Sequence, residues 1–325
     1  MHVASRAAMV VLVLLLSGCG SRTSTREELS DALSDSASPS LPPSSPPSVA
    51  PTTSSAVPTT SAPAAGAEEL ARLAESAQAA VSALPSGAGA GADAGTVEGA
   101  DVSWPQCPKG MGIPQRPTLG SPMPLDSARF VILGLTNGPG FTANPCLADQ
   151  VAWARQRHLL VSAYSVISWP SAEQLARYGT PAKAGRAQAL ANLATLKAAG
   201  LTTPAIWLDV EPVPDFDWPS GKGALAANAE VVTAVAQTYA DSGYQVGVYS
   251  TTALWQRVVG TLSLGLREWR AAGHTSRAEA LVRCGAQRTI QGGSAVLAQW
   301  VEDGRDRNVT CPGGSAQLTA WFSQY

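Results

Sequence analysis

Charged and histidine residues are scarce in this chain of 325 residues. Only 14% of the residues are Asp, Glu, Lys or Arg, and 22 basic against 24 acidic residues leave a net charge of −2. A nucleic-acid-binding protein usually carries a broad basic surface, so no nucleic-acid partner is expected. The chain has three histidines and no CxxC, HExxH or HxxxH pattern, so the sequence predicts neither a metal site nor a cofactor.

Long apolar runs and the catalytic-serine motif are also missing. The one long apolar run covers residues 7–16, whereas a membrane-spanning helix needs about 20 residues. The sequence therefore excludes a multi-pass membrane protein. No G-x-S-x-G motif is present, which argues against a serine hydrolase.

The first nineteen residues have the order of an export signal. A basic start with Arg6 precedes the apolar run, and Leu16-Ser17-Gly18-Cys19 follows it. This ending resembles the lipobox of bacterial lipoproteins, in which the cysteine becomes the lipidated N-terminus after cleavage. The resemblance implies a signal peptide at residues 1–18 and a lipidated Cys19. It also implies an extracytoplasmic protein anchored by lipid to the outer face of the plasma membrane.

The composition of residues 19–66, which begin with the lipidated cysteine, predicts a disordered linker. Residues 36–67 contain no charged side chain, and eight prolines lie between Pro39 and Pro63. Proline breaks helices, and this composition offers no apolar face for packing. Residues 67–98 predict a short amphipathic helix that Pro85 ends, followed by a Gly/Ala-rich joint.

Residues 99–325 predict one α/β domain. Strands are expected at residues 99–103, 130–136, 159–165, 205–211, 244–250 and 296–301, and helices at 145–158, 181–199 and 223–242. Residues 262–293 give no clear pattern. Alternation of strands and helices over this length predicts a TIM-like (β/α) barrel, regular or else irregular and incomplete, preceded by the disordered tether.

Asp209 and Glu211 are the strongest candidates for chemistry. Side chains alternate along a strand, so Trp207, Asp209 and Glu211 share one face, which would point into the barrel mouth. Pro212 ends the strand, and the two carboxylates would lie about 6.6 Å apart where barrel active sites lie. Two close carboxyls raise each other's pKa, which can keep one protonated for acid catalysis. The alternative to a catalytic pair is two strand-end carboxylates that are solvated or paired with arginine.

Weaker candidates lie near both ends of the domain. Asp101 alternates with apolar neighbours and would face the same mouth, although such an Asp can also cap a turn. Residues 306–308 are by themselves typical of a polar turn. Five arginines and two glutamates between positions 267 and 288 predict a solvated helix face, with contact to an anionic wall polymer as the alternative.

Together these motifs resemble the family-25 glycoside hydrolases, lysozymes that cut peptidoglycan. The matches to that family's motifs are Asp101-Val102-Ser103-Trp104-Pro105-Gln106 for D-V-S-x-x-Q, Asp209-Val210-Glu211 for D-x-E, Tyr249 for a strand-end tyrosine, and Gln299-Trp300 with Asp306-Arg307-Asn308 for the closing Gln-Trp and D-x-N. The D-V-S and D-x-E matches are the most specific. The resemblance runs through nearly the whole domain.

The resemblance implies a glycoside hydrolase that cleaves the glycan strands of peptidoglycan from a membrane-anchored position. Glu211 would be the proton donor and Asp209 its charged partner. The expected substrate-binding residues are Asp101, Asp306, Tyr249, Trp104 and Gln299. Added cysteines place the chain nearest an extracytoplasmic, cysteine-bearing branch. Two alternatives stay open: an inactive peptidoglycan- or carbohydrate-binding lipoprotein that uses the same cleft, and a structural scaffold at the wall.

Four cysteines remain once Cys19 is assigned to the lipid. An exported domain meets an oxidising environment, in which such an even set forms disulfides. Three pairings are possible, and proximity along the chain favours Cys107 with Cys146 and Cys284 with Cys311.

Tryptophan is unusually frequent, with nine against four phenylalanines. Several tryptophans fall near expected strand ends, and sugar rings stack on such side chains. Trp104 and Trp218 are the candidates for stacking on the glycan, with burial in the core as the alternative.

Overall fold

A computed structural model describes residues 95–213 and 216–325. The predicted signal peptide, the lipidated Cys19, the linker at 19–66 and the helix expected after residue 67 lie outside these residues. In the part of the chain that is described, no helix combines the length and the apolar character needed to cross a bilayer.

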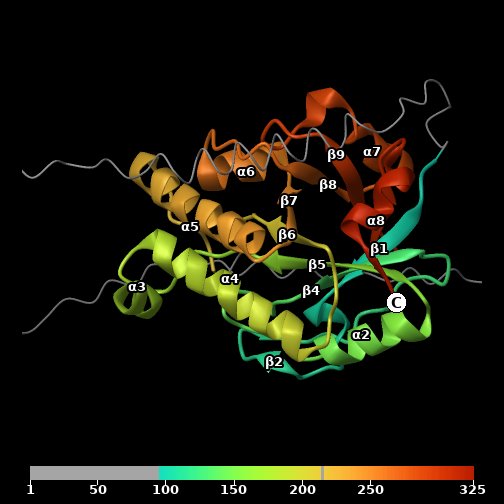
Figure 1. The fold of residues 1–325 in the computed structure, drawn as a ribbon, viewed down its shortest axis with the longest axis horizontal. Coiled ribbons are helices and arrows are strands. Elements are labelled where there is room, and N and C mark those ends of the chain that lie inside the picture. Colours follow the sequence, from blue (N-terminus) through green and yellow to red (C-terminus); the bar gives the residue numbers. More distant parts are fainter. Residues whose placement is uncertain (1–94, 214–215) are drawn as a thin grey trace, which may run out of the picture. The chain divides into compact units, whose positions relative to one another are not determined.

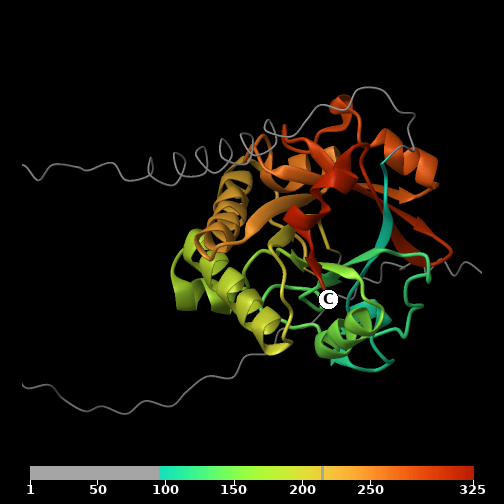
Figure 2. The ribbon, with the colours of Figure 1, turned by 45° about the vertical axis from the view of Figure 1, so that its right-hand side comes forward.

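Eight strands close into a barrel, which confirms the predicted fold class. Neighbouring strands follow the order β5-β4-β1-β10-β9-β8-β7-β6, and β6 pairs with β5 to close the ring (Figure 1). The strands are β1 (Glu98–Val102), β4 (Phe130–Gly134), β5 (Leu160–Val166), β6 (Ala205–Asp209), β7 (Gln245–Ser250), β8 (Arg267–His274), β9 (Ala295–Glu302) and β10 (Arg305–Thr310). In Figure 2, β1, in cyan, lies beside the red strands from the end of the chain.

The barrel departs from a regular (β/α) pattern at β10. This strand is antiparallel to both of its neighbours, β1 and β9, whereas the other pairs in the ring are parallel. β9 and β10 form a hairpin whose turn residues, Asp303 and Gly304, both have positive φ, 51° and 67°. Asp-Gly is the typical sequence of such a two-residue turn. The prediction of a turn at residues 306–308 is therefore wrong, because the chain reverses at Asp303-Gly304 and residues 306–308 lie within β10.

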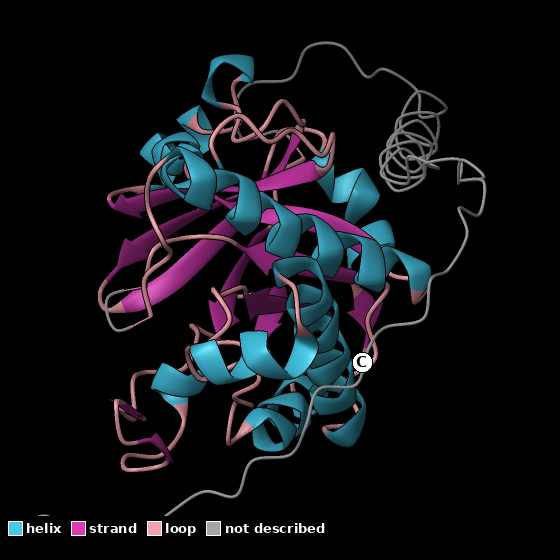
Figure 3. Cartoon of the chain, turned by 90° about the vertical axis from the view of Figure 1, so that its left-hand side faces the viewer, coloured by secondary structure: helices cyan, strands magenta, loops and turns pink. Residues whose placement is uncertain are grey.

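Helices pack around the barrel (Figure 3). The predicted helices are confirmed as α2 (Leu147–Gln156), α4 (Pro181–Ala198) and α5 (Lys222–Asp241). Gly200 and Gly243 follow α4 and α5 with φ of 65° and 88°, the left-handed conformation that ends helices. The structure adds α3 (Ala172–Tyr178), α6 (Thr252–Val259), α7 (Arg277–Val282) and α8 (Leu318–Trp321).

Side chains of β6 alternate between two layers, as predicted. Ile206 and Leu208 pack between the strands and the helices. Trp207 points into the barrel, where its ring stacks on that of Trp321 with centroids 4.5 Å apart. The next residue on the inner face is Asp209, so this packing fixes the register that turns the carboxyl toward the barrel mouth.

Two disulfides form, and both have the predicted pairing. Cys107–Cys146 joins the loop after β1 to the start of α2, and Cys284–Cys311 joins the loop after α7 to the residue after β10. Their Cα atoms are 5.6 and 5.5 Å apart. Each bond closes a loop in the unfolded chain and so stabilises the fold by about 2–4 kcal/mol.

Candidate active site

The carboxyl ends of the parallel strands surround a cleft of about 480 Å³. All seven residues that the family resemblance assigns to catalysis or substrate binding line it: Asp101, Trp104, Asp209, Glu211, Tyr249, Gln299 and Asp306. β10 runs opposite to its neighbours, so its first residues come to the same end of the barrel as the last residues of the parallel strands. The reversal of β10 therefore brings Asp306 into the cleft.

Asp101 is held by two amide side chains inside the barrel. Its Oδ1 accepts hydrogen bonds from Gln299 Nε2 at 3.0 Å and from Asn308 Nδ2 at 2.6 Å. The amide oxygens are occupied too, because Tyr249 donates to Gln299 Oε1 at 2.6 Å and Trp269 donates to Asn308 Oδ1 at 2.7 Å. This network fixes both amide groups beside Asp101. Asn308 belongs to the matched D-x-N motif, whereas sequence reasoning missed Trp269, whose partner lies far away in the chain.

Burial dominates the ionisation of Asp101. It raises the pKa of this carboxyl to about 8, and the charge of nearby Asp306 adds to the rise. The hydrogen bonds from Gln299 and Asn308 act in the opposite direction because they stabilise the anion. Burial likewise raises the pKa of Asp306, against a lowering by His274. The cleft therefore favours neutral carboxyls over a wider pH range than water does.

Asp209 ends β6 with its side chain nearly buried, at 5% exposure. Burial raises its pKa well above the ordinary value, and the charges of Glu211 and Asp101 raise it further. This direction is opposite to the expectation that Asp209 stays ionised. Its Oδ1 has no hydrogen-bond partner among the described residues. Asp209 thus lines the cleft while its Oδ1 is shielded from solvent and unsatisfied.

Glu211 lies two residues further on and is half-buried. Burial raises the pKa of its carboxyl, and the charge of Asp306 raises it too, whereas Arg116 lowers it. The backbone carbonyl oxygen of Glu211 accepts a hydrogen bond of 3.2 Å from Trp218 Nε1. The indole therefore fixes the main chain that carries the carboxyl.

Arg116 is a cleft residue that sequence reasoning missed. It comes from a small hairpin between β1 and β4, formed by β2 (Gly112–Ile113) and β3 (Arg116–Pro117). Its guanidinium carbon lies 5.7 Å from the ring centroid of Trp104 and 5.4 Å from that of Phe216. The positive charge lowers the pKa of both Asp209 and Glu211. No motif marks this arginine in the sequence, because only the folded loop brings it to the cleft.

The two tryptophans predicted to stack on sugars have different environments. Trp104 is half-buried and lines the cleft, so its stacking role stays a prediction. Trp218 is buried at 6% exposure in the layer between the barrel and the helices. The stacking role predicted for Trp218 is wrong, because the core covers its ring.

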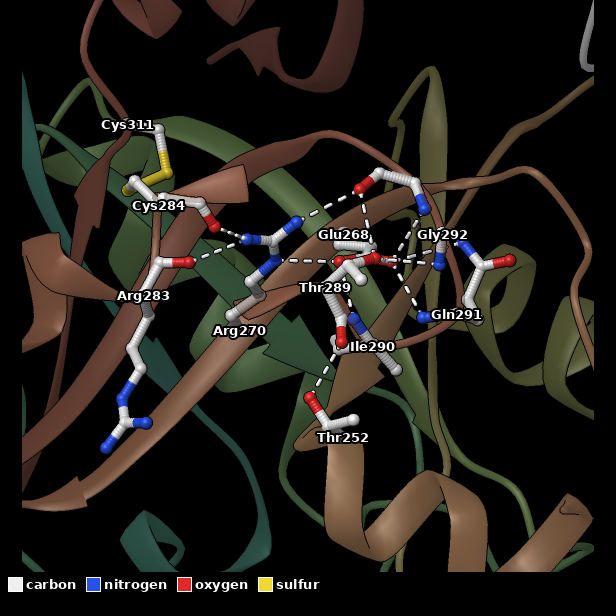
Figure 4. A network of polar contacts seen from close by, with 12 residues as sticks. Thr252, Glu268, Arg270, Arg283, Cys284, Thr289, Ile290, Gln291, Gly292 and Cys311 are labelled. Atoms are coloured by element: carbon white, nitrogen blue, oxygen red, sulfur yellow. Dashed lines mark hydrogen bonds and ion pairs between the residues drawn. A yellow bond between two sulfur atoms is a disulfide. The ribbon is translucent and has the colours of Figure 1, made fainter. Parts of the chain in front are cut away.

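The solvated helix face predicted for residues 267–288 is wrong for residues 267–274, which form β8, whereas α7 in the second part of the stretch is a helix with Glu279 exposed. Glu268 and Arg270 are a buried ion pair at 2.7 Å, with side-chain exposures of 0% and 3%. Glu268 also accepts hydrogen bonds from the backbone N–H groups of Ile290, Gln291 and Gly293 (Figure 4). The pair fixes the loop before β9 to the barrel wall.

The carboxyl cluster suits acid–base chemistry better than metal binding. Among the residues in the described ranges, no group of three or more His, Cys, Asp or Glu side chains is placed to hold a metal ion. Carboxyls with raised pKa values can instead deliver a proton to a bound substrate near neutral pH.

Part of this domain matches a known family. Residues 152–276 match the family model described as "Lysozyme-like protein 1". This part of the chain is lysozyme-like. It includes Asp209, Glu211 and Tyr249, whereas Asp101, Gln299 and Asp306 lie outside the matched range.

One curated relative is similar over a short stretch. "Lysozyme-like protein 5" from Caenorhabditis elegans is 37% identical over 73 residues, which are 22% of this chain and 31% of that protein. The match thus spans about a third of the relative's length.

Solved structures with a similar chain path include two lysozymes. A bacterial lysozyme from Streptomyces coelicolor is 16% identical, with a TM-score of 0.46, over 69% of this chain and 96% of that chain. A family GH25 lysozyme from Aspergillus fumigatus is 18% identical, with a TM-score of 0.44, over 70% of this chain and 100% of that chain.

Proposed function

We propose that the domain is a glycoside hydrolase of the family-25 lysozyme type. Its substrate is the N-acetylmuramyl–N-acetylglucosaminyl linkage of peptidoglycan. The observation that carries this proposal is the position of Asp209 and Glu211 at the end of β6, inside a cleft that Asp101 and Asp306 also line. The lysozyme-like match supports it, because residues 152–276 include both members of the pair.

Glu211 is the proton donor in this proposal. Burial raises the pKa of its carboxyl, so the protonated form persists to a higher pH than for an exposed glutamate. The side chain is only half-buried, which leaves it accessible to a glycosidic oxygen in the cleft. General acid catalysis of this kind contributes about 10²–10⁴-fold to the rate.

Asp209 orients the acetamido group of the bound sugar. Asp209 lines the cleft, and its carboxylate is the acceptor for the acetamido N–H. Accepting this hydrogen bond stabilises the anion and lowers the pKa of Asp209, and the resulting charge raises the pKa of Glu211. Sugar binding therefore drives the pair toward an ionised Asp209 and a protonated Glu211.

The oriented acetamido oxygen can then attack the anomeric carbon as the glycosidic bond breaks. Activation of a water molecule by Asp209 is the other route. Glu211 lies beyond the end of β6, so strand spacing does not select between the two routes.

A peptidoglycan-binding lipoprotein without turnover is the second candidate. Arg116 favours it, because a guanidinium near Glu211 lowers the pKa of the carboxyl that must hold a proton. Binding through the same cleft needs neither protonated Glu211 nor ionised Asp209.

The proposed location is the outer face of the plasma membrane. Lipidation of Cys19 after cleavage of residues 1–18 would anchor the chain, and the linker at 19–66 would carry the barrel into the wall. The order of basic start, apolar run and Leu16-Ser17-Gly18-Cys19 supports this proposal.

The test is the release of muropeptides from purified peptidoglycan by the full-length protein in detergent. Glu211→Gln should lower the rate at least about 100-fold, and Asp209→Asn should lower it as well. Glu230→Gln on α5 is the matched control, because Glu230 is exposed and lies outside the cleft.

Two results decide between the candidates. Release by the wild type that Glu211→Gln abolishes supports the hydrolase. Equal release by both proteins contradicts the role of Glu211, and binding to the wall without release by either establishes the binding module.

A further inference from the structure

A second cavity, of about 240 Å³, lies at the start of α6. Thr251 and Ala271 line both this cavity and the main cleft, so the two are neighbours. Its cationic lining consists of Arg270, Arg283 and Arg288, and neither Asp nor Glu lines it. The proposed reaction assigns no role to these arginines.

Two of the three arginines contribute uncompensated charge. Arg270 is neutralised by Glu268, and its remaining N–H groups donate to the carbonyl oxygens of residues 283, 285 and 293. Arg283 and Arg288 have no side-chain hydrogen bond or ion pair with any described residue, and the Nε of Arg283 is shielded from solvent. Arg283 is half-buried and Arg288 is exposed, so the unpaired N–H groups at the ends of both side chains are open to a ligand in the cavity.

The first turn of α6 adds backbone donors to the same cavity. Thr252 and Ala253 line it as the first two residues of the helix, where N–H groups have no acceptor within the helix. The N–H of Leu254 is already satisfied by Thr251 Oγ1 at 3.1 Å. The positive end of the helix dipole therefore reinforces the charge of Arg283 and Arg288.

The loop that carries Arg283 and Arg288 is held rigidly in place. Glu268 binds its backbone at Ile290, and the Thr252 hydroxyl donates to the carbonyl oxygen of Thr289 at 2.7 Å (Figure 4). The Cys284–Cys311 disulfide holds the other end of the loop. The fixed backbone keeps both arginines beside the cavity, so the loop itself loses little freedom when a ligand binds.

We propose that this cavity is a subsite for an oxyanion carried by the glycan strand that occupies the main cleft. The inference rests on the proposed function and names a specificity within it. Peptidoglycan strands carry carboxylates on their stem peptides and phosphodiesters where other wall polymers are attached. Both offer acceptor oxygens to guanidinium and helix N–H groups, and the two sources are separable by experiment.

The experiment measures dissociation constants of soluble glycan fragments for the full-length protein by calorimetry. Four glycan fragments are compared. One carries stem peptides only, one a phosphodiester only, one carries both, and the bare glycan carries neither. The double variant Arg283→Gln/Arg288→Gln should bind an oxyanion-bearing fragment about five- to tenfold more weakly and bind the bare glycan as the wild type does. High salt should reduce the difference.

Arg186→Gln is the matched control, because Arg186 is exposed on α4 and lines neither cavity. The fragment whose affinity depends on the two arginines identifies the source of the oxyanion. Equal affinities of the double variant and the wild type for all oxyanion-bearing fragments overturn the subsite.

Failure of the catalytic proposal has a different signature. If no fragment is cleaved but the arginines still determine affinity, the subsite stands and the protein is a binder. If fragments are cleaved and the arginines have no effect on affinity, the subsite falls and the hydrolase stands. Absence of binding to every fragment overturns both.

Discussion

Asn308 donates a hydrogen bond of 2.6 Å from Nδ2 to Oδ1 of Asp101, 207 positions earlier in the chain. The two residues lie on β10 and β1, which pair antiparallel with Gly99 opposite Asn308. The Asn308 oxygen accepts from Trp269 Nε1, so the amide is fixed at both ends. The antiparallel strand β10, which makes the barrel irregular, thus supplies a hydrogen bond that orients Asp101, the first acidic residue of the cleft.

Replacement of Asn308 should destabilise the protein. In Asn308→Ala, the buried carboxyl of Asp101 and the indole N–H of Trp269 each lose a partner. Unsatisfied buried groups cost about 1–3 kcal/mol each, so a loss of about 2–4 kcal/mol in unfolding free energy is expected from urea denaturation. Gln256→Ala, at an exposed position on α6, is the control. A loss no larger than that of the control would show that the network adds no stability.

The raised pKa of Asp101 predicts a pH dependence of stability. The folded pKa of about 8 lies above the ordinary value of 3.8, so the folded state keeps a proton that the unfolded state releases. The contribution is fully present below about pH 4 and is lost as the pH rises to about 8.

Asp101→Asn removes this titration while retaining an acceptor oxygen for Gln299 and Asn308. The unfolding free energy of the variant should fall less steeply between pH 4 and 8, by at most about 1.4 kcal/mol per pH unit. Parallel pH profiles of the variant and the wild type would mean that Asp101 does not titrate abnormally.

Local pattern was enough to predict the part of the site that lies on β6. Alternation along this strand separated the inner residues Trp207 and Asp209 from the outer ones, and the structure has the same separation. Alternation depends only on strand geometry, so one sequence suffices to detect it.

Contacts between segments that lie far apart in the chain could not be predicted from the sequence. Glu268 and Arg270 look like surface residues, and their burial depends on the backbone of the loop before β9. Arg116 reaches the cleft because Asn137 Nδ2 donates to its carbonyl oxygen at 3.3 Å. The Asp303-Gly304 dipeptide is a local turn signal, and it sets the direction of β10.

Removal of either disulfide should lower stability without changing the fold. Cys107→Ala/Cys146→Ala and Cys284→Ala/Cys311→Ala should each lose about 2–4 kcal/mol of unfolding free energy in urea. A reducing agent should lower the unfolding free energy of the wild type. It should not change that of a variant in which all four of these cysteines are replaced by alanine. Free thiols, or a cross-linked pair other than these two, in non-reducing peptide maps would contradict the structure.

Lipidation of Cys19 predicts membrane association. In Cys19→Ala the protein should leave the membrane fraction for the medium or retain its first 18 residues, because no acyl chain can be attached. Ser36→Ala, within the linker, should stay in the membrane fraction. Unchanged detergent partitioning of Cys19→Ala would show that another part of the chain anchors the protein.

Arg116 should set the upper end of the pH range for activity. Its charge lowers the pKa of Glu211, and the proposed proton donor is active only while protonated. Arg116→Gln should therefore raise that pKa and move the alkaline limb of the kcat/KM profile to higher pH. Arg186→Gln should leave the profile unchanged. If Arg116→Gln lowers activity equally at every pH, the arginine binds substrate without acting on the ionisation of Glu211.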